Sequence, residues 1–320
     1  MEEVPREHTK YDAGVTRHFL TGEELTADEL TELLDRADFL KRDRWASAQL
    51  SGRSVALVFE KPSTRTRISF EVGVHELGGN PVVLREGEMQ LSRGESQRDT
   101  ALVLSRFVHA IAVRTFADSL LEELAEHSSV PVINMLTDGH HPCQVLADLQ
   151  TIRERFGKLD GLKLAYVGDG NNVANSLMLL GAKAGLHVAM ATPPGLAPDP
   201  ALVERAGERV HVTTDPAEAA DGAHVLYTDV WVSMGDEAEA ERRRSLLAPY
   251  QLNEALLERA RPDAIVLHCL PAHVGEEITE GLLYGERSAV FDQAENRLHA
   301  QKALLELLLG PPSRSLPASG

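Results

Sequence analysis

Residues 55–70 read Val-Ala-Leu-Val-Phe-Glu-Lys-Pro-Ser-Thr-Arg-Thr-Arg-Ile-Ser-Phe, an apolar run followed directly by hydroxyl and guanidinium side chains. The run at 55–59 is typical of a buried strand. Phe70, Val74 and Leu77 recur at helical spacing, so we expect a helix to begin just after it. Hydroxyls, backbone N–H groups and arginines at a helix N-terminus suit an anion, so this stretch predicts a phosphate site. The alternative is an ordinary Ser/Thr cap with solvated arginines, which two arginines in one capping turn make less favoured.

Composition and charge limit the classes of function. The 320 residues, 43% apolar and 25% charged, leave room for two domains with separate cores. A net charge of −17 argues against a nucleic-acid or membrane surface but allows a local basic pocket. Two cysteines, Cys143 and Cys269, cannot build a disulfide framework, and no stretch approaches the about 18 apolar residues that cross a bilayer. We therefore expect a soluble, cytoplasmic protein.

Strand-like apolar runs alternate with amphipathic segments along both halves of the chain. The runs lie at 55–59, 81–84, 110–113 and 130–133, then at 163–167, 187–191, 210–212, 225–227 and 264–268. Helical segments between them include 100–107, 119–127, 173–184 and 253–261. Such alternation is typical of βαβ units, so the sequence predicts an α/β fold of two doubly wound α/β domains, each with a mainly parallel central sheet.

The boundary between the two domains is expected where the helix that begins at Pro142 runs out into glycines, near 151–161. We assign residues 1–150 to the first domain and 151–299 to the second. A last helix, within about 300–320, follows the second set of strands and is compatible with packing back on the first domain.

Polar clusters follow the predicted strands, where open α/β sheets bind ligands. Arg114 follows the third run, and His140-His141-Pro142-Cys143-Gln144 follows the fourth, with the proline suited to the first turn of a helix. An arginine and a histidine near an anion site can polarise a carbonyl group or neutralise developing charge.

The second half opens with Gly168-Asp169-Gly170-Asn171-Asn172, which superficially resembles a dinucleotide-binding fingerprint. Val173 stands where the third glycine belongs, and the next strand ends without the acidic residue that binds ribose. The pattern therefore disfavours a nicotinamide cofactor, and its amide side chains suit a small polar ligand better.

Clusters at 140–143 and 268–273 together hold four histidines and two cysteines, a composition that raises the possibility of zinc. Neither cluster has the short paired spacing of a zinc site, so we predict no metal. Cys269 is conceivable as a nucleophile with His268 or His273 as its base, although neighbours on a strand point to opposite faces. Cys143 is expected to be an ordinary buried cysteine.

Four motifs now support a family resemblance: residues 59–67, 141–144, 229–235 (Asp-Val-Trp-Val-Ser-Met-Gly) and 268–271 (His-Cys-Leu-Pro). In this order they resemble the aspartate/ornithine transcarbamoylase superfamily, and within it the ornithine carbamoyltransferases. The similarity runs from about Gly52 to Leu309.

The resemblance implies a carbamoyl-phosphate domain, an ornithine domain and an active site between them. It implies transfer of the carbamoyl group to the δ-amine of L-ornithine, giving L-citrulline and phosphate through a tetrahedral intermediate, as part of arginine metabolism. It also implies a homotrimer or a multiple of trimers, and no metal or organic cofactor.

The resemblance also assigns the site residues. Carbamoyl phosphate would be bound by Ser63, Thr64, Arg65, Thr66, Gln90 of a neighbouring subunit, Arg114, His141, Gln144, Cys269, Leu270 and Arg297. Ornithine would be bound by Asn172, Asp229, Ser233 and Met234. The catalytic residues would be Arg114, His141, Cys269 and Asp229.

Three questions stay open at this point. Another acceptor amine is possible. Putrescine would not need the 233–235 loop, so the presence of this loop disfavours putrescine. Relatives that use aspartate carry Thr at the position of Cys143, so Cys143 disfavours aspartate. A non-catalytic binding protein on the same fold is a further alternative. Whether Cys269 accepts a proton or only lines the pocket is undecided, and Val274 stands where many relatives carry Arg.

Overall fold

The computed structural model describes residues 16–85, 87–88, 94–232 and 239–310. The predicted site residues Gln90, Ser233 and Met234 lie outside these ranges.

The first half of the chain builds a four-stranded parallel sheet of β1 (Ser54–Phe59), β2 (Asn80–Arg85), β3 (Ala110–Arg114) and β4 (Val132–Leu136) in the order β2-β1-β3-β4. Alternate residues of β1 face two hydrophobic clusters, Val55 and Leu57 one cluster, and Ala56 and Val58 the other. Both faces of the sheet are therefore covered, as the alternating pattern predicted.

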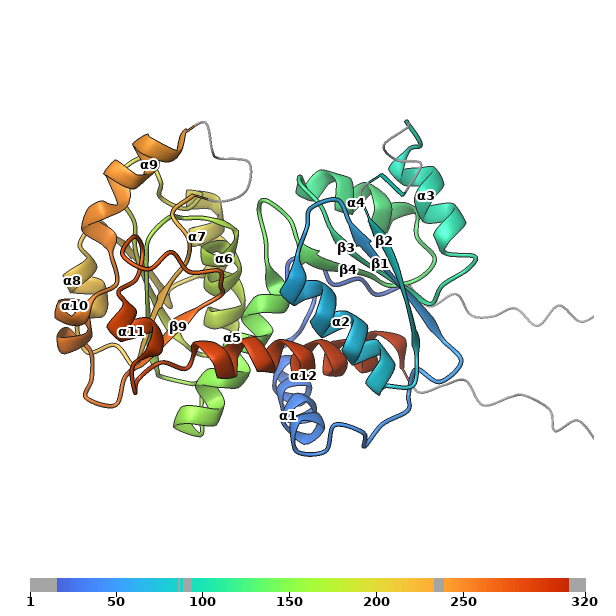
Figure 1. The fold of residues 1–320 in the computed structure, drawn as a ribbon, viewed down its shortest axis with the longest axis horizontal. Coiled ribbons are helices and arrows are strands. Elements are labelled where there is room, and N and C mark those ends of the chain that lie inside the picture. Colours follow the sequence, from blue (N-terminus) through green and yellow to red (C-terminus); the bar gives the residue numbers. More distant parts are fainter. Residues whose placement is uncertain (1–15, 86, 89–93, 233–238, 311–320) are drawn as a thin grey trace, which may run out of the picture.

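The helices of this half are α1 (Ala27–Arg42), α2 (Thr64–Glu76), α3 (Gln97–Leu104), α4 (Asp118–His127) and α5 (Pro142–Phe156). α2 packs on β1 and β2, while α3 and α4 pack on each other and cover the other face (Figure 1).

The second half builds a five-stranded parallel sheet of β5 (Lys163–Val167), β6 (His187–Ala191), β7 (Val210–Thr213), β8 (Val225–Thr228) and β9 (Ile265–His268) in the order β7-β6-β5-β8-β9. Its helices are α6 (Asn172–Ser176), which continues as the π-helical turn η2 (Leu177–Gly181), α7 (Pro200–Ala206), α8 (Pro216–Ala220), α9 (Ala240–Leu247) with the 3-10 turn η4 (Ala248–Tyr250), α10 (Glu254–Arg259) and α11 (Glu280–Tyr284). The prediction of two α/β units with parallel sheets is thus confirmed.

Strand order determines where a site can form. The chain runs from β1 to β2 on one side and returns to β3 on the other, and β5 lies likewise between β6 and β8. Ligands in open α/β sheets bind at the carboxyl ends of strands beside such reversals. Here those ends are followed by Ser63, Arg114, Gly168 and Asp229.

The last helix begins earlier than predicted. α12 spans Val290–Leu309, so the expected start near residue 300 is wrong by about one-half of the helix, and residues 311–320 lie outside the description. The sequence pattern did not predict its first turns, because polar residues, including Gln293 and Asn296, occupy buried positions there and interrupt the periodicity of apolar residues. α12 packs on α1, α2 and α5 and runs along both sheets (Figure 1).

Smaller differences have local causes. β4 starts at Val132 rather than 130, since Pro131 has no N–H for the strand ladder.

Within the described ranges, no helix is long and apolar enough to cross a membrane.

Candidate active site

The turn between β1 and α2 forms a Ser cap, the feature named as the alternative for this stretch. Ser63 is the N-cap of α2, and its hydroxyl accepts a hydrogen bond of 3.3 Å from the backbone N–H of Thr66. Ser63 and Thr64 line an open cavity of about 620 Å³ that extends to Arg85 of β2. The cap leaves the N-terminus of the 13-residue helix facing this space, which suits an anion.

Arg65 and Arg297 link the capping turn to residues far away in the sequence. Arg65 donates a hydrogen bond of 2.6 Å to the backbone oxygen of Leu270. Arg297, from α12, is buried and donates to the Thr66 hydroxyl and to Oε1 of Gln144. Residues far apart in the sequence therefore meet at one point.

Arg114 completes a group of three cations. It lies at the carboxyl end of β3, is 8% exposed, and its Nε has no hydrogen-bond partner among the described residues. Burial, followed by the charges of Arg297 and Arg65, lowers the pKa of Arg114 to about 10. Three guanidinium groups that repel one another in a dry pocket favour a bound anion.

His141 faces the same cations. Burial, followed by the charges of Arg297, Arg114 and Arg65, holds the pKa of His141 well below its ordinary value. The imidazole is therefore neutral at pH 7 and can donate one N–H without adding a fourth positive charge. It is the N-cap of α5, directly before Pro142.

Gln144 is oriented from both sides. Its Oε1 accepts from Arg297, and its Nε2 donates 2.8 Å to Oδ1 of Asp148. The same Asp148 oxygen accepts 2.7 Å from Gln293 of α12, and burial raises the pKa of Asp148 to about 7. One amide hydrogen of Gln144 stays available for a ligand. The sequence analysis did not single out Asp148. Its only signal in the sequence is that residues 144 and 148 lie on the same face of a helix.

Asp229, after β8, is the centre of the acidic half of the site. Its Oδ1 accepts 2.8 Å from the thiol of Cys269, and its Oδ2 accepts 2.8 Å from Nδ2 of Asn171. Burial and then the Asp229 charge raise the pKa of Cys269 well above its ordinary value. Cys269 is consequently a thiol at neutral pH and acts as a hydrogen-bond donor in this arrangement.

The state of this thiol can be tested. We expect Cys269 to react with iodoacetamide at pH 7.5 more slowly than a free thiol, because only the thiolate is a good nucleophile. Asp229→Asn removes a negative charge, which lowers the pKa of Cys269 and raises its thiolate fraction, so alkylation should accelerate about tenfold. Mass spectrometry of the modified peptide measures the rate, and buried Cys143, whose pKa burial raises to about 12, is the internal control. Equal rates of Cys269 alkylation in the unaltered protein and in Asp229→Asn would contradict the conclusion that Asp229 raises the pKa of this thiol.

The Gly168–Asn172 segment is a helix start with a close backbone contact. The side-chain oxygen of Asn171 caps α6 by accepting from the N–H groups of Val173 and Ala174, which places its Nδ2 on Asp229. A Cβ at Gly170 would lie 2.5 Å from the backbone nitrogen of Pro198. Sequence reasoning missed the role of Asn171 as a support for Asp229, although the Asn-Asn pair was the signal.

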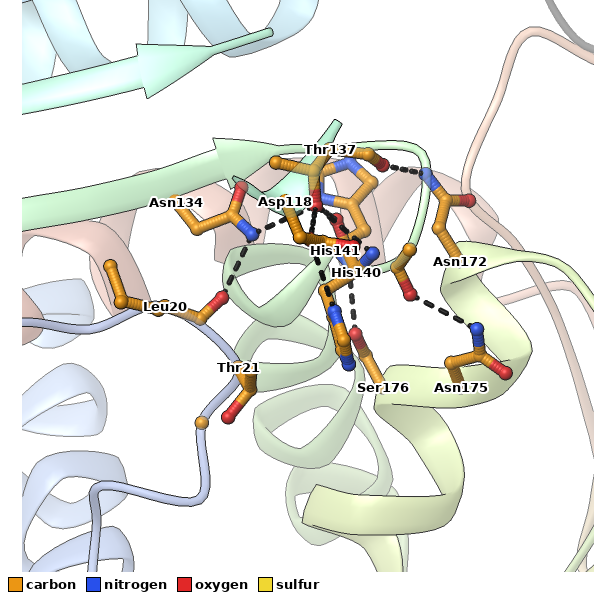
Figure 2. A network of polar contacts seen from close by, with 12 residues as sticks. Leu20, Thr21, Asp118, Asn134, Thr137, His140, His141, Asn172, Asn175 and Ser176 are labelled. Atoms are coloured by element: carbon orange, nitrogen blue, oxygen red, sulfur yellow. Dashed lines mark hydrogen bonds and ion pairs between the residues drawn. The ribbon is translucent and has the colours of Figure 1, made fainter. Parts of the chain in front are cut away.

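Asn172 has its amide turned toward the first domain. Its Nδ2 donates 2.7 Å to the backbone oxygen of Thr137 (Figure 2). Its Oδ1 makes none of the side-chain hydrogen bonds found among the described residues, so an ornithine contact would use that oxygen.

Residues 268–270 form a rigid turn. Nδ1 of His268 accepts 2.8 Å from the N–H of Leu270, so the ring hydrogen lies on Nε2, 3.1 Å from Oε1 of buried Glu277. Leu270 has a φ of 60° and precedes a cis peptide bond to Pro271. The turn directs the oxygen of Leu270 at Arg65, and Glu277 supports it, which sequence reasoning also missed.

The metal hypothesis can be compared with the geometry. Among the described residues, the possible donor groups are Asp229 with His268 and Cys269, and His273 with Glu276 and Glu277, their atoms within 4.8 Å of one another. Neither of these two groups contains a residue of the 140–143 cluster, so the two clusters considered for zinc do not form a common donor group. Both ring nitrogens of His268 are already bonded within the protein.

Family models match both halves of the chain. Residues 17–154 match the carbamoyl-P binding domain of aspartate/ornithine carbamoyltransferase, and residues 160–308 match its Asp/Orn binding domain. The fold and site are thus those of a carbamoyltransferase. The chain belongs to the aspartate/ornithine carbamoyltransferase family.

Similar proteins agree with this membership. The chain is 59% identical over 301 residues to an ornithine carbamoyltransferase of Acidothermus cellulolyticus, covering 92% of this chain and 96% of the relative. Ornithine carbamoyltransferase structures from Thermus thermophilus (TM-score 0.85, 49% identity, 91% and 98% of the two chains) and Pyrococcus furiosus (TM-score 0.87, 46% identity, 92% and 97%) share its fold. A structure of N-acetyl-L-ornithine transcarbamylase is more distant, at 31% identity and a TM-score of 0.82, covering 91% and 99%.

Proposed function

We propose that this chain transfers the carbamoyl group of carbamoyl phosphate to the δ-amine of L-ornithine, giving L-citrulline and phosphate. One observation carries the proposal: three buried or half-buried guanidinium groups, of Arg65, Arg114 and Arg297, meet beside the Asp229–Cys269 pair. The cations suit a phosphorylated donor, and the carboxylate suits a cationic amino acid.

The donor would lie against the N-terminus of α2. Ser63, Thr64, Arg65 and Thr66 would hold the phosphate through N–H groups, hydroxyls and the guanidinium. Arg114 and neutral His141 would donate to the carbonyl oxygen, where negative charge develops in the tetrahedral intermediate. Gln144 would bind the carbamoyl amide, with Cys269, Leu270 and Arg297 completing the pocket.

The acceptor would lie toward the second sheet. Asp229, held by Asn171, would bind a cationic nitrogen of ornithine, and Asn172, Ser233 and Met234 would complete the site. The neutral δ-amine attacks the carbonyl carbon as a C–N bond forms. The C–O bond to phosphate then breaks and phosphate leaves with the electron pair, and the departing phosphate takes up the proton that the attacking nitrogen loses. A protonated Cys269 supports a role as donor to Asp229 rather than as the first base.

The proposed assembly is a homotrimer or a multiple of trimers, in which Gln90 reaches a neighbouring site. The outward side chains of Leu102 in α3 and Phe107 just after it, which are 46% and 72% exposed, support an interface beside α3. Free Cys143 and Cys269 support a reducing, cytoplasmic location, and the product supports a place in arginine metabolism.

The decisive experiment measures ureido products from carbamoyl phosphate with ornithine, N-acetylornithine, putrescine or aspartate, each with and without a chelator. We expect citrulline from ornithine at a rate the chelator does not change, from a preparation whose mass by light scattering is a multiple of three chains. Product from a different amine alone would refute the acceptor assignment. No product from any amine would favour a binding protein on the same fold.

A further inference from the structure

Helix α6 of the second domain contacts the loop that leads to His141. Three α6 side chains at positions i, i+3 and i+4 lie along this loop (Figure 2). Asn172 Nδ2 donates 2.7 Å to the oxygen of Thr137, and Asn175 Nδ2 donates 3.0 Å to the oxygen of Gly139. The Ser176 hydroxyl accepts 2.8 Å from the backbone N–H of His141.

The spacing of these contacts matches the two partners. Residues 137, 139 and 141 offer backbone groups to residues 172, 175 and 176 in the same order along both segments, and a hydrogen bond of 2.9 Å from the N–H of Thr137 to the oxygen of His140 bends the loop between them. Each contact uses a backbone group of the loop, so the helix holds the path of the main chain rather than one loop side chain.

The other side of the loop is fixed to the first domain. The Thr137 hydroxyl donates to Asp118 and accepts 3.2 Å from Asn134 Nδ2, while the ring of His140 lies 3.2 Å from Asp118 (Figure 2). A Cβ at Gly139 would lie 2.0 Å from Oδ2 of Asp118, so the loop lies directly against this carboxylate. The loop is thus held between the two domains.

His141 depends on this loop for its direction. It is the N-cap of α5 without a side-chain capping bond, and its buried Nδ1 has no hydrogen-bond partner in the part of the chain that the structure describes. Fully buried Ser176 is therefore the group that fixes its backbone N–H. The π-helical turn η2 follows Ser176 directly, and such turns alter which side chains a helix presents.

We propose that Ser176 and Asn175 are positioning residues through which the second domain sets the place of the His141 imidazole. The inference rests on the proposed function, in which His141 binds the carbonyl oxygen of the donor. It gives the second domain a part in binding the first substrate: a shift of α6 moves the His141 loop. Conversely, occupancy at His141 favours the arrangement of the two domains in which these three hydrogen bonds form.

A double-mutant cycle between positions 176 and 141 separates positioning from general damage. The probe is phosphonoacetamide, in which a methylene replaces the bridging oxygen of carbamoyl phosphate, and its dissociation constant is measured by calorimetry. We expect Ser176→Ala to weaken binding about tenfold and to lower kcat at saturating substrates. In the His141→Ala background, which keeps the backbone N–H, the same change should alter binding less than twofold.

Matched variants complete the test. If Ser176→Ala folds poorly, Asn175→Ala, at a half-buried position, serves as the substitute variant. It should weaken probe binding in the same way but to a smaller extent. Ser288→Ala removes another second-domain hydroxyl, which bonds the oxygen of Leu283 away from the loop, and should bind the probe like the unaltered protein.

The outcomes separate the two proposals. Equal weakening by Ser176→Ala in both backgrounds, or no weakening by Ser176→Ala and Asn175→Ala, would overturn the positioning role alone. Probe binding without citrulline formation would refute the acceptor assignment while leaving the cycle readable. An unaltered protein that binds no probe would overturn both.

Discussion

Arg114→Ala is expected to lower kcat/KM for citrulline formation by about 10²- to 10³-fold, the loss typical of removing one hydrogen-bond donor from a developing oxyanion. The guanidinium is buried at the end of β3, and its Nε has no partner within the described ranges, so it is placed for a ligand rather than for a structural bond. Arg65 and Arg297 cannot replace it, because both already donate within the protein. Initial rates against each substrate measure the effect.

The same variant should not lose stability in the empty state. Burial and the charges of Arg297 and Arg65 disfavour the charged form of Arg114, as its lowered pKa of about 10 indicates, yet the group stays protonated at pH 7. Removing it relieves that repulsion, so the unfolding midpoint without ligand should be unchanged or higher. A ligand at 100 times its dissociation constant stabilises a protein by about 2.7 kcal/mol, and this gain from phosphonoacetamide should largely vanish.

Arg114→Lys is the matched control, since it keeps the charge and removes the planar fork. We expect it to recover part of the ligand-induced stabilisation but little of the rate. A rate for Arg114→Ala within tenfold of the unaltered protein would remove this residue from the active site.

Local sequence patterns were sufficient where burial and propensity agree. The runs at 163–167 and 187–191 predict strands whose bounds the structure reproduces, because strands buried on both faces are continuously apolar. The 62–70 stretch predicts the cap of α2, since a cap depends only on neighbouring residues. Ser63 caps α2 as an ordinary cap residue does, while the phosphate site at the same helix end stays a prediction.

Prediction failed where a residue is defined by a partner far along the chain. Asp148, Asn171, Ser176 and Glu277 are polar residues whose roles come from contacts across a turn, a sheet or a domain boundary. In α12, Gln293 and Asn296 are buried because α5 provides their hydrogen-bond partners, Asp148 and Thr151. The periodicity of hydrophobic residues does not indicate such positions. Their side chains are polar, and they can be buried because each finds a hydrogen-bond partner.

α12 joins the two halves of the molecule through polar as well as apolar contacts. Arg297 bonds Gln144 and Thr66, while Lys302, five residues later, is fully buried between α2 and the segment after α1. Its Nζ lies 2.9 Å from Oε2 of buried Glu76 and 2.5 Å from the oxygen of Arg44. The other Glu76 oxygen accepts from the Arg44 guanidinium. Two cations therefore share this one carboxylate as their counter-charge.

Glu76→Ala should lower the free energy of unfolding by about 3–5 kcal/mol, because it leaves the Lys302 ammonium buried without a counter-charge. Burial alone would raise the pKa of Glu76, but its bonds to Arg44 and Lys302 outweigh burial and lower it. Its contribution to stability is thus present above the unfolded-state pKa and is lost as the pH falls through the folded-state value. Thermal and urea unfolding measure both effects.

Two comparisons distinguish a lost charge pair from lost packing. The double variant Glu76→Leu with Lys302→Met removes both charges and should recover most of the lost stability, since apolar replacements of a buried pair are often neutral. Asp263→Ala, which breaks the exposed pair with Arg261, should leave the free energy of unfolding almost unchanged. If the double variant were as unstable as Glu76→Ala, the loss would arise from packing at α12 and not from the unpaired charge. Below its unfolding temperature Glu76→Ala should keep near-normal kcat, because the pair lies away from Arg297 and the anion pocket.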